Sequence, residues 1–298
     1  MFPIIPANSV TAASGNDEGI FGYGTTGGYL SMTNLVSNAG VVATDVAGVG
    51  TGRYALAACE YGGDKGIFGY GYTGSNVSIT NLVSNAGVVA SDQAATTGTG
   101  RQYPAACGYG DDKGIFGFGN PGTPTAATNL VSNAGVVSSD VVGVGTARRG
   151  LAACEYGGDK GIFGFGYSGL SMTNLVSNAG VVATDTAGVG TGRGYLAACG
   201  YGGDKGIFGY GNGGLSITNL VSNAGVVSSD VAGVGTGRQV LAATQYGGDK
   251  GIFGFGAVGA GWTPLTSITN LVSNAGVVAS DTAEVGTARS APAACSFN

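Results

Sequence analysis

The sequence alternates short apolar runs with glycine-rich polar turns along its whole length. The unit from Leu56 to Arg101 holds four such runs, each too short for a helix and bounded by turn residues, which is typical of strands. In residues 66–71, Phe68 and Tyr70 fall on one face and glycines occupy most of the other, because side chains alternate along a strand. This strand would therefore have a bulky face and a bare face that a neighbouring sheet can approach closely.

Tight turns join the predicted strands in pairs. Glycines at 62 and 63 permit positive φ in the turn before Lys65, and the Asn85-Ala86-Gly87 turn follows the third run. A segment of changing sequence joins the second strand to the third. The four antiparallel strands of this unit are expected at residues 56–61, 66–71, 79–84 and 88–92.

The unit recurs six times. The string TNLVSNAGVV is unchanged in every copy, and successive copies lie 45 to 51 residues apart. Six units of four strands predict an all-β fold, a six-bladed β-propeller with four antiparallel strands per blade, in one domain over residues 1–298. A β-solenoid is the alternative, although its coils would not need a hairpin turn at every strand junction. The copies begin at Thr33, Thr80, Thr128, Thr173, Thr218 and Thr269.

The two ends of the chain compete for one strand position. Residues 292–297 (PAACSF) repeat the first strand of the unit a seventh time, whereas the N-terminal region offers only the weaker residues 9–14 (SVTAAS). We expect the C-terminal copy to pair with residues 19–24 and close the first blade. Residues 1–8 would then form a short N-terminal arm.

The repeat resembles known families. The string RYALAACEYGGDKGIFGYG, which begins at Arg53, resembles the kelch-type propeller repeat, although it lacks the usual Gly-Gly after the second strand and the Trp of the fourth. Units of the form YGGDKGIFGYG, TNLVSNAGVVATD and GVGTGR resemble repeats in structural proteins of tailed bacteriophages. The kelch resemblance implies that the first strand of each blade lies nearest the axis. The phage resemblance implies a virion component, such as a tail fibre, decoration or appendage protein, with other virion proteins as partners.

The composition of the chain limits the classes of partner that we expect. Only 10 % of residues are charged and the net charge is −5, so the basic footprint of a nucleic-acid binder is absent. The N-terminal region lacks a basic start followed by an apolar stretch, and no segment has 18 consecutive apolar residues. We expect no signal peptide and no membrane insertion, which agrees with synthesis in a host cytoplasm and location in a virion.

Candidate catalytic chemistry is sparse. The sequence has no histidine, and most charged residues recur in repeat register, which generates rings of identical groups instead of one site with divided roles. We therefore expect that the protein is not an enzyme and that it has no cofactor and no metal site. Asp92 and Arg101, which flank the crossing to the next unit, are expected to form a structural ion pair. Asp64 and Lys65 are expected to stabilise a turn, with a calcium-binding ring of aspartates as the alternative.

The five cysteines each follow an Ala-Ala pair at one repeat position, where Thr244 takes the sixth place. One thiol per repeat cannot pair within its own repeat, so we expect five free, buried thiols. The cysteines are Cys59, Cys107, Cys154, Cys199 and Cys295.

The parts that differ between repeats are the candidate binding site. They are the segments between the second and third strands, the longest being residues 257–268, and the two residues after each repeated arginine. In a four-stranded blade both emerge on one face. We expect this face to bind virion partners or a host-surface glycan, since aromatic side chains suit sugar stacking and protein contacts. A stand-alone, lectin-like propeller is the alternative, and drift of exposed loops would give the same variation. The candidate residues are Trp262, Tyr29, Tyr72, Tyr167, Tyr54, Tyr103 and Tyr195.

Overall fold

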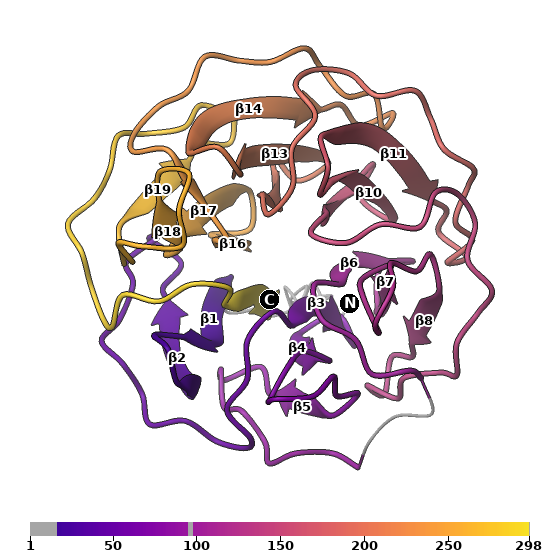
Figure 1. Cartoon of the computed structure of the whole chain (residues 1–298), viewed down its shortest axis with the longest axis horizontal. Helices are drawn as coiled ribbons and strands as arrows, with labels where there is room; N and C mark the ends of the chain where they lie inside the picture. The colour runs from indigo at the N-terminus through magenta and orange to yellow at the C-terminus, as the bar shows by residue number, and fades with distance from the viewer. Residues whose placement is uncertain (1–16, 95–97, 298) are drawn as a thin grey trace, which may run out of the picture.

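The computed structural model describes residues 17–94 and 98–297. Within these residues every regular element is a β-strand, so the predicted all-β class is confirmed. The strands form six three-stranded antiparallel sheets and one two-stranded sheet. Figure 1 shows the six larger sheets arranged around a common centre.

The six larger sheets follow the repeats. From the innermost strand outwards, the first three are sheet 1 (β20 Ala293–Phe297, β1 Glu18–Thr25, β2 Tyr29–Val36), sheet 2 (β3 Ala57–Tyr61, β4 Lys65–Gly69, β5 Thr80–Val83) and sheet 3 (β6 Ala105–Tyr109, β7 Lys113–Gly117, β8 Thr128–Val131). In the same order of strands, the other three are sheet 4 (β9 Ala152–Tyr156, β10 Lys160–Gly166, β11 Leu170–Val176), sheet 5 (β12 Ala197–Tyr201, β13 Lys205–Gly211, β14 Leu215–Val221) and sheet 6 (β16 Ala242–Tyr246, β17 Lys250–Gly254, β19 Thr269–Val272). The small sheet pairs β15 (Arg238–Gln239) with β18 (Ala257–Val258).

Glycines in the middle strands let adjacent sheets approach closely. A Cβ added to Gly69 would lie 2.7 Å from the Phe116 ring of the next sheet, and one added to Gly114 would lie 2.5 Å from the Cys59 sulfur. Equivalent glycines meet equivalent side chains around the molecule, including Gly254 against Phe21. The bare face predicted for this strand is therefore filled by the neighbouring sheet.

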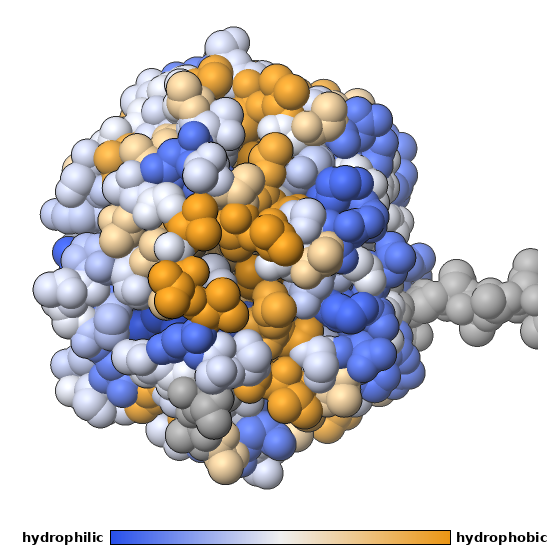
Figure 2. All heavy atoms as spheres, turned by 90° about the vertical axis from the view of Figure 1, so that its right-hand side faces the viewer, coloured by the Kyte–Doolittle hydropathy of each residue, from blue (hydrophilic) through white to orange (hydrophobic). Residues whose placement is uncertain are grey.

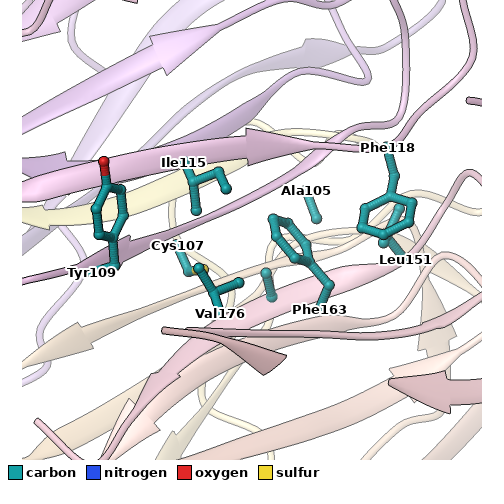
Figure 3. Packing of buried hydrophobic residues seen from close by; sticks show 9 residues of the cluster. Ala105, Cys107, Tyr109, Ile115, Phe118, Leu151, Phe163 and Val176 are labelled. Atoms are coloured by element: carbon teal, nitrogen blue, oxygen red, sulfur yellow. The ribbon is translucent and has the colours of Figure 1, made fainter. Parts of the chain in front are cut away.

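The core lies between sheets. Between sheets 3 and 4, for example, Ile115 and Val176 are fully buried, and the Phe118 and Phe163 rings meet edge to face with centroids 5.2 Å apart. Figure 3 shows these side chains converging from neighbouring strands. Burial of each such side chain stabilises the fold by about 1.5–3 kcal/mol. Each sheet therefore depends on the next for its apolar contacts.

The fourth strand is absent as a continuous element. In sheet 2, residues 88–92 form one isolated bridge, between Val89 and Val83, with backbone hydrogen bonds at Val88 and Ala90 but no continuous strand, so the four-stranded prediction is wrong for the described residues. The Asn81 side-chain amide donates to the Ala90 carbonyl at 3.0 Å, which replaces a backbone partner in the ladder.

This outer segment leaves apolar side chains in solvent. The first valine after each Asn-Ala-Gly turn is 65–66 % exposed, and Figure 2 shows a band of apolar residues across the side of the molecule. These valines are Val41, Val88, Val136, Val181, Val226 and Val277.

Sheet 1 combines the two ends of the described chain. β20 pairs antiparallel with β1, placing Cys295 opposite Ile20 and Ala294 opposite Phe21. The innermost strands contact one another in the cyclic order β3, β6, β9, β12, β16, β20 and again β3. The proposed arm at residues 1–8 and the competing strand at residues 9–14 lie outside the described residues.

A buried arginine connects each sheet to the next. The Arg53 side chain is fully buried, with its guanidinium carbon 4.3 Å from the centroid of the Tyr23 ring in sheet 1. In sheet 2, Arg53 Nε donates to the Tyr70 carbonyl at 2.8 Å and Nη2 donates to Asn81 Oδ1 at 2.7 Å. One side chain therefore bonds to one sheet while it stacks on the other.

Asparagine extends this contact to an aspartate, and we call the set the Arg–Asn–Asp clasp. Asn81 Nδ2 donates to Asp92 Oδ1 at 2.9 Å, and the Thr51 hydroxyl donates to the same carboxylate at 2.6 Å. All six repeats contain the clasp. Its last copy joins Arg289 to Asn34 and Thr287 to Asp45, across the two ends of the chain.

The clasp differs from the ion pair that was predicted between Asp92 and Arg101. Asp92 and Arg101 do not pair across their own crossing; Arg101 instead lies 3.7 Å from Asp140 of the next repeat. The reason is that Arg101 lies just before the first strand of sheet 3, and its long side chain bonds within that sheet, to Asn129 and beside Asp140. Partial burial would raise the pKa of Asp92, but hydrogen bonds from Thr51 and Asn81 and the charge of Arg53 outweigh it and lower that pKa.

Removing residues 290–298 should unfold the protein or make it oligomerise. The deletion takes away β20 and leaves the edge of β1 unpaired. Thermal melts and size-exclusion chromatography measure the effect. Deletion of residues 1–8 is the control and should change stability much less; equal tolerance of both truncations would contradict the closing role of β20.

Neutralising one clasp should destabilise the protein in a pH-dependent way. We expect Asp92→Asn to lower the free energy of unfolding by about 1 kcal/mol at pH 7, a modest figure because the carboxylate is partly exposed. The folded-state pKa is depressed, so this stabilisation is present above the unfolded pKa of about 4 and is lost as pH falls through the folded value. The difference from wild type should therefore vanish near pH 2.

Chemical denaturation at several pH values gives the comparison. Asp111→Asn is the matched control, because Asp111 makes none of the clasp hydrogen bonds and its replacement leaves every clasp intact. A constant difference between pH 7 and pH 2 for Asp92→Asn would disprove the electrostatic part of the clasp.

Candidate ligand site on the aromatic face

A ring of backbone hydrogen bonds underlies the site. The second residue after each repeated arginine donates its N–H to the carbonyl of its counterpart in the preceding repeat, at distances of 2.7–3.3 Å. The bonds run through all six repeats and return to the first. The ring consists of Ala55, Tyr103, Gly150, Tyr195, Val240 and Ala291.

Every residue of the hydrogen-bonded ring has a left-handed backbone. The φ angles lie between 48° and 61°, although only Gly150 is a glycine. Each of the other five residues carries a steric cost of about 1–2 kcal/mol, which the ring bonds and surrounding packing must offset. The ring thus fixes the directions in which Tyr103 and Tyr195 leave the backbone.

The structure brings all seven predicted aromatic residues into one connected set, the aromatic cluster. The Tyr103 ring lies 5.2 Å from Tyr195 and 6.4 Å from Tyr54. Tyr195 extends the set to Trp262 and Tyr167, each at 5.5 Å. Tyr54 extends it to Tyr29 at 5.8 Å and Tyr72 at 5.7 Å. The rings come from different repeats, because the hydrogen-bonded ring and the variable loops meet on this face.

An open cavity of about 560 Å³ lies within the aromatic cluster. Its walls combine aromatic rings with hydroxyl groups, the arrangement of a small-molecule site. Tyr29 and Trp262 are each 45 % exposed, so their faces are available to a ligand. The lining residues are Thr25, Thr26, Gly27, Tyr29, Tyr54, Tyr103, Trp262, Thr263, Leu265 and Ser290.

Residues 257–268 are held in place by the preceding repeat junction. Gln239 lies in β15, which pairs with β18 at the start of this loop. Its side-chain amide donates to the Ala260 carbonyl at 3.0 Å and to the Gly261 carbonyl at 2.6 Å. These bonds fix the loop immediately before Trp262.

Arg149 lies beside this cluster but was not among the predicted site residues. Its guanidinium carbon lies 4.9 Å from the centroid of Tyr167, and its Nε is buried without a hydrogen-bond partner among the described residues. The available signal was its position: it directly follows the repeated Arg148 and is the one cationic residue outside repeat register.

The repeated Asp and Lys turns make structural contacts on a different part of the molecule. Lys65 pairs with Asp64, whose other oxygen accepts from Asn85 Nδ2 at 3.2 Å. The Gly62 N–H donates to the Asp112 carbonyl of the next turn at 2.8 Å. These contacts tie the two repeated turns of one sheet to each other and to a turn of the next sheet, as expected for a structural role.

Two glutamates occupy the centre of the molecule. Burial raises the pKa of both Glu60 and Glu155, and the Ser296 hydroxyl donates to the Glu60 carboxylate. The small cavity beside them holds about 60 Å³. Within residues 17–94 and 98–297, no group of three His, Cys, Asp or Glu side chains is placed to hold a metal ion.

The five thiols are free and buried, as predicted. Burial raises the pKa of each thiol, so these cysteines are unsuited to act as nucleophiles at neutral pH. Their sulfurs fill the space left by glycines of the next sheet.

No protein-family model and no curated protein sequence matches the chain. The part of the chain that the structure describes also contains no helix long and apolar enough to cross a membrane.

Thiol accessibility provides a test of this packing. Mass measurement of non-reduced protein should show five reduced cysteines, and a thiol reagent should label them slowly until denaturant is added, because each sulfur is enclosed between two sheets. Rapid labelling of Cys107 in the native protein would contradict the packing.

Proposed function

We propose that the six sheets are the blades of a closed, kelch-like β-propeller that acts as a binding platform and not as an enzyme. The cyclic contacts of the innermost strands, the pairing of β20 with β1 and the hydrogen-bonded ring all support closure. The positions of most carboxylates support a structural role for these groups, because they recur in clasps and turns instead of gathering around one reactive position.

The aromatic face is proposed to bind a carbohydrate. The observation that carries this proposal is the cavity of about 560 Å³, which is lined by Tyr29, Tyr54, Tyr103 and Trp262 together with threonine and serine hydroxyls. Tyrosine and tryptophan offer a flat apolar surface with a polar edge, which suits the apolar face of a sugar. The hydroxyls can exchange hydrogen bonds with sugar hydroxyls.

The biological setting is proposed to be a virion. The likeness of the repeats to structural proteins of tailed bacteriophages supports a tail fibre, decoration or appendage protein that binds other virion proteins and a host-surface glycan. Mass spectrometry of purified virions tests this setting. Absence from virions combined with glycan binding by the isolated protein would favour the stand-alone, lectin-like alternative.

Trp262→Ala tests the ligand site. On a glycan array the variant should bind at least ten-fold more weakly than wild type, because it loses the largest exposed ring of the cavity. Its melting temperature should change little, since the indole is 45 % exposed.

Val88→Ala, which shortens an exposed apolar side chain outside the cavity, is the control and should bind normally. Binding that survives Trp262→Ala but is lost on changing Asp64 and Lys65 would place the site at the repeated turns and contradict the proposal.

A further inference from the structure

Eleven of the twelve lysine and arginine residues have a repeated structural position. Five lysines lie in the repeated turns, where each pairs with the preceding aspartate. Six arginines are buried in the Arg–Asn–Asp clasps. Arg149 is the remaining cation, and it lies beside the aromatic cluster.

Arg149 has aromatic neighbours but no anionic one. Its guanidinium carbon lies 4.9 Å from the Tyr167 centroid, and none of the ion pairs among the described residues includes it. Burial raises the pKa of Tyr195, and the charge and hydrogen bonding of Arg149 oppose this rise. A half-buried guanidinium without a carboxylate retains hydrogen-bonding capacity for a ligand.

The cavity and Arg149 are linked through two rings. Tyr103 and Trp262 line the cavity, and both contact Tyr195. Tyr195 in turn contacts Tyr167, on which Arg149 stacks. A ligand larger than one ring could therefore occupy the cavity and reach Arg149 across the aromatic surface.

We propose that the ligand is an acidic saccharide whose carboxylate or sulfate group binds the Arg149 guanidinium while a sugar ring occupies the cavity. This inference rests on the proposed carbohydrate-binding function. The planar guanidinium can form two parallel hydrogen bonds to such a group. One cation in a protein with a net charge of −5 matches a single acidic group better than a polyanion, which would be repelled.

The test compares matched ligands and matched variants. A glycan array would carry uronate-containing, sialylated and sulfated glycans beside their carboxyl-reduced or desulfated counterparts. The fluorescence of Trp262, the one tryptophan, then measures affinity in solution for the best acidic glycan and its neutral counterpart. The proteins are wild type, Arg149→Gln, Arg149→Lys and Lys65→Gln, the last removing one cation from the repeated turns.

Wild type should prefer the acidic member of a pair about ten-fold or more, and added salt should reduce this preference. Arg149→Gln should abolish the preference while leaving affinity for the neutral member within about two-fold, because only the charged contact is lost. Arg149→Lys should retain part of the preference for the acidic glycan, because the positive charge remains but the planar guanidinium is lost. Lys65→Gln should behave as wild type.

Equal wild-type affinity for the acidic and neutral members would overturn this inference and leave carbohydrate binding intact. An acidic preference that survives Arg149→Gln would also overturn it. Failure of wild type to bind any glycan would instead contradict the proposed function itself. Comparison of the paired ligands on wild type keeps the test valid if a variant folds poorly, and circular dichroism verifies folding.

Discussion

The structure depends on holding one small sheet against the next, and the buried guanidinium of each Arg–Asn–Asp clasp makes this contact. A single three-stranded sheet has no second layer of its own against which to bury its apolar faces, so each sheet needs its neighbours. Arg53 stacks on Tyr23 of one sheet and bonds to Tyr70 and Asn81 of the next. A buried guanidinium is costly to leave unpaired, so the requirement for these partners favours one relative placement of the two sheets.

Repetition explains why the chemistry of the molecule is concentrated in its exceptions. The clasps, turn pairs and buried thiols recur, and each is satisfied within the protein. The departures from the repeat are the long loop with Trp262, the tyrosines after the repeated arginines, and Arg149. These departures meet on one face because the hydrogen-bonded ring brings the repeat junctions together beside the variable loops.

Short-range patterns predicted much of this arrangement. Alternation along residues 66–71 predicted a strand with a bare face, and the structure fills that face at Gly69 with the Phe116 ring of the next sheet. The seven aromatic residues were selected because they vary between repeats, and they form one cluster. The pairing of Arg101 with Asp140 and the loss of the fourth strand were missed, since both depend on side chains from another segment: the next repeat for the arginine, and Asn81 for the strand.

The hydrogen-bonded ring also limits the number of repeats. Identical stretches such as TNLVSNAGVV invite gain or loss of a whole unit by recombination between copies of the coding sequence. A ring of five or seven units would have a different circumference and a different angle between successive units, so the φ angles of 48–61° that give distances of 2.7–3.3 Å here would have to change. Copy number is thus constrained by backbone geometry at the centre, while the loops around it remain free to diverge in length and sequence.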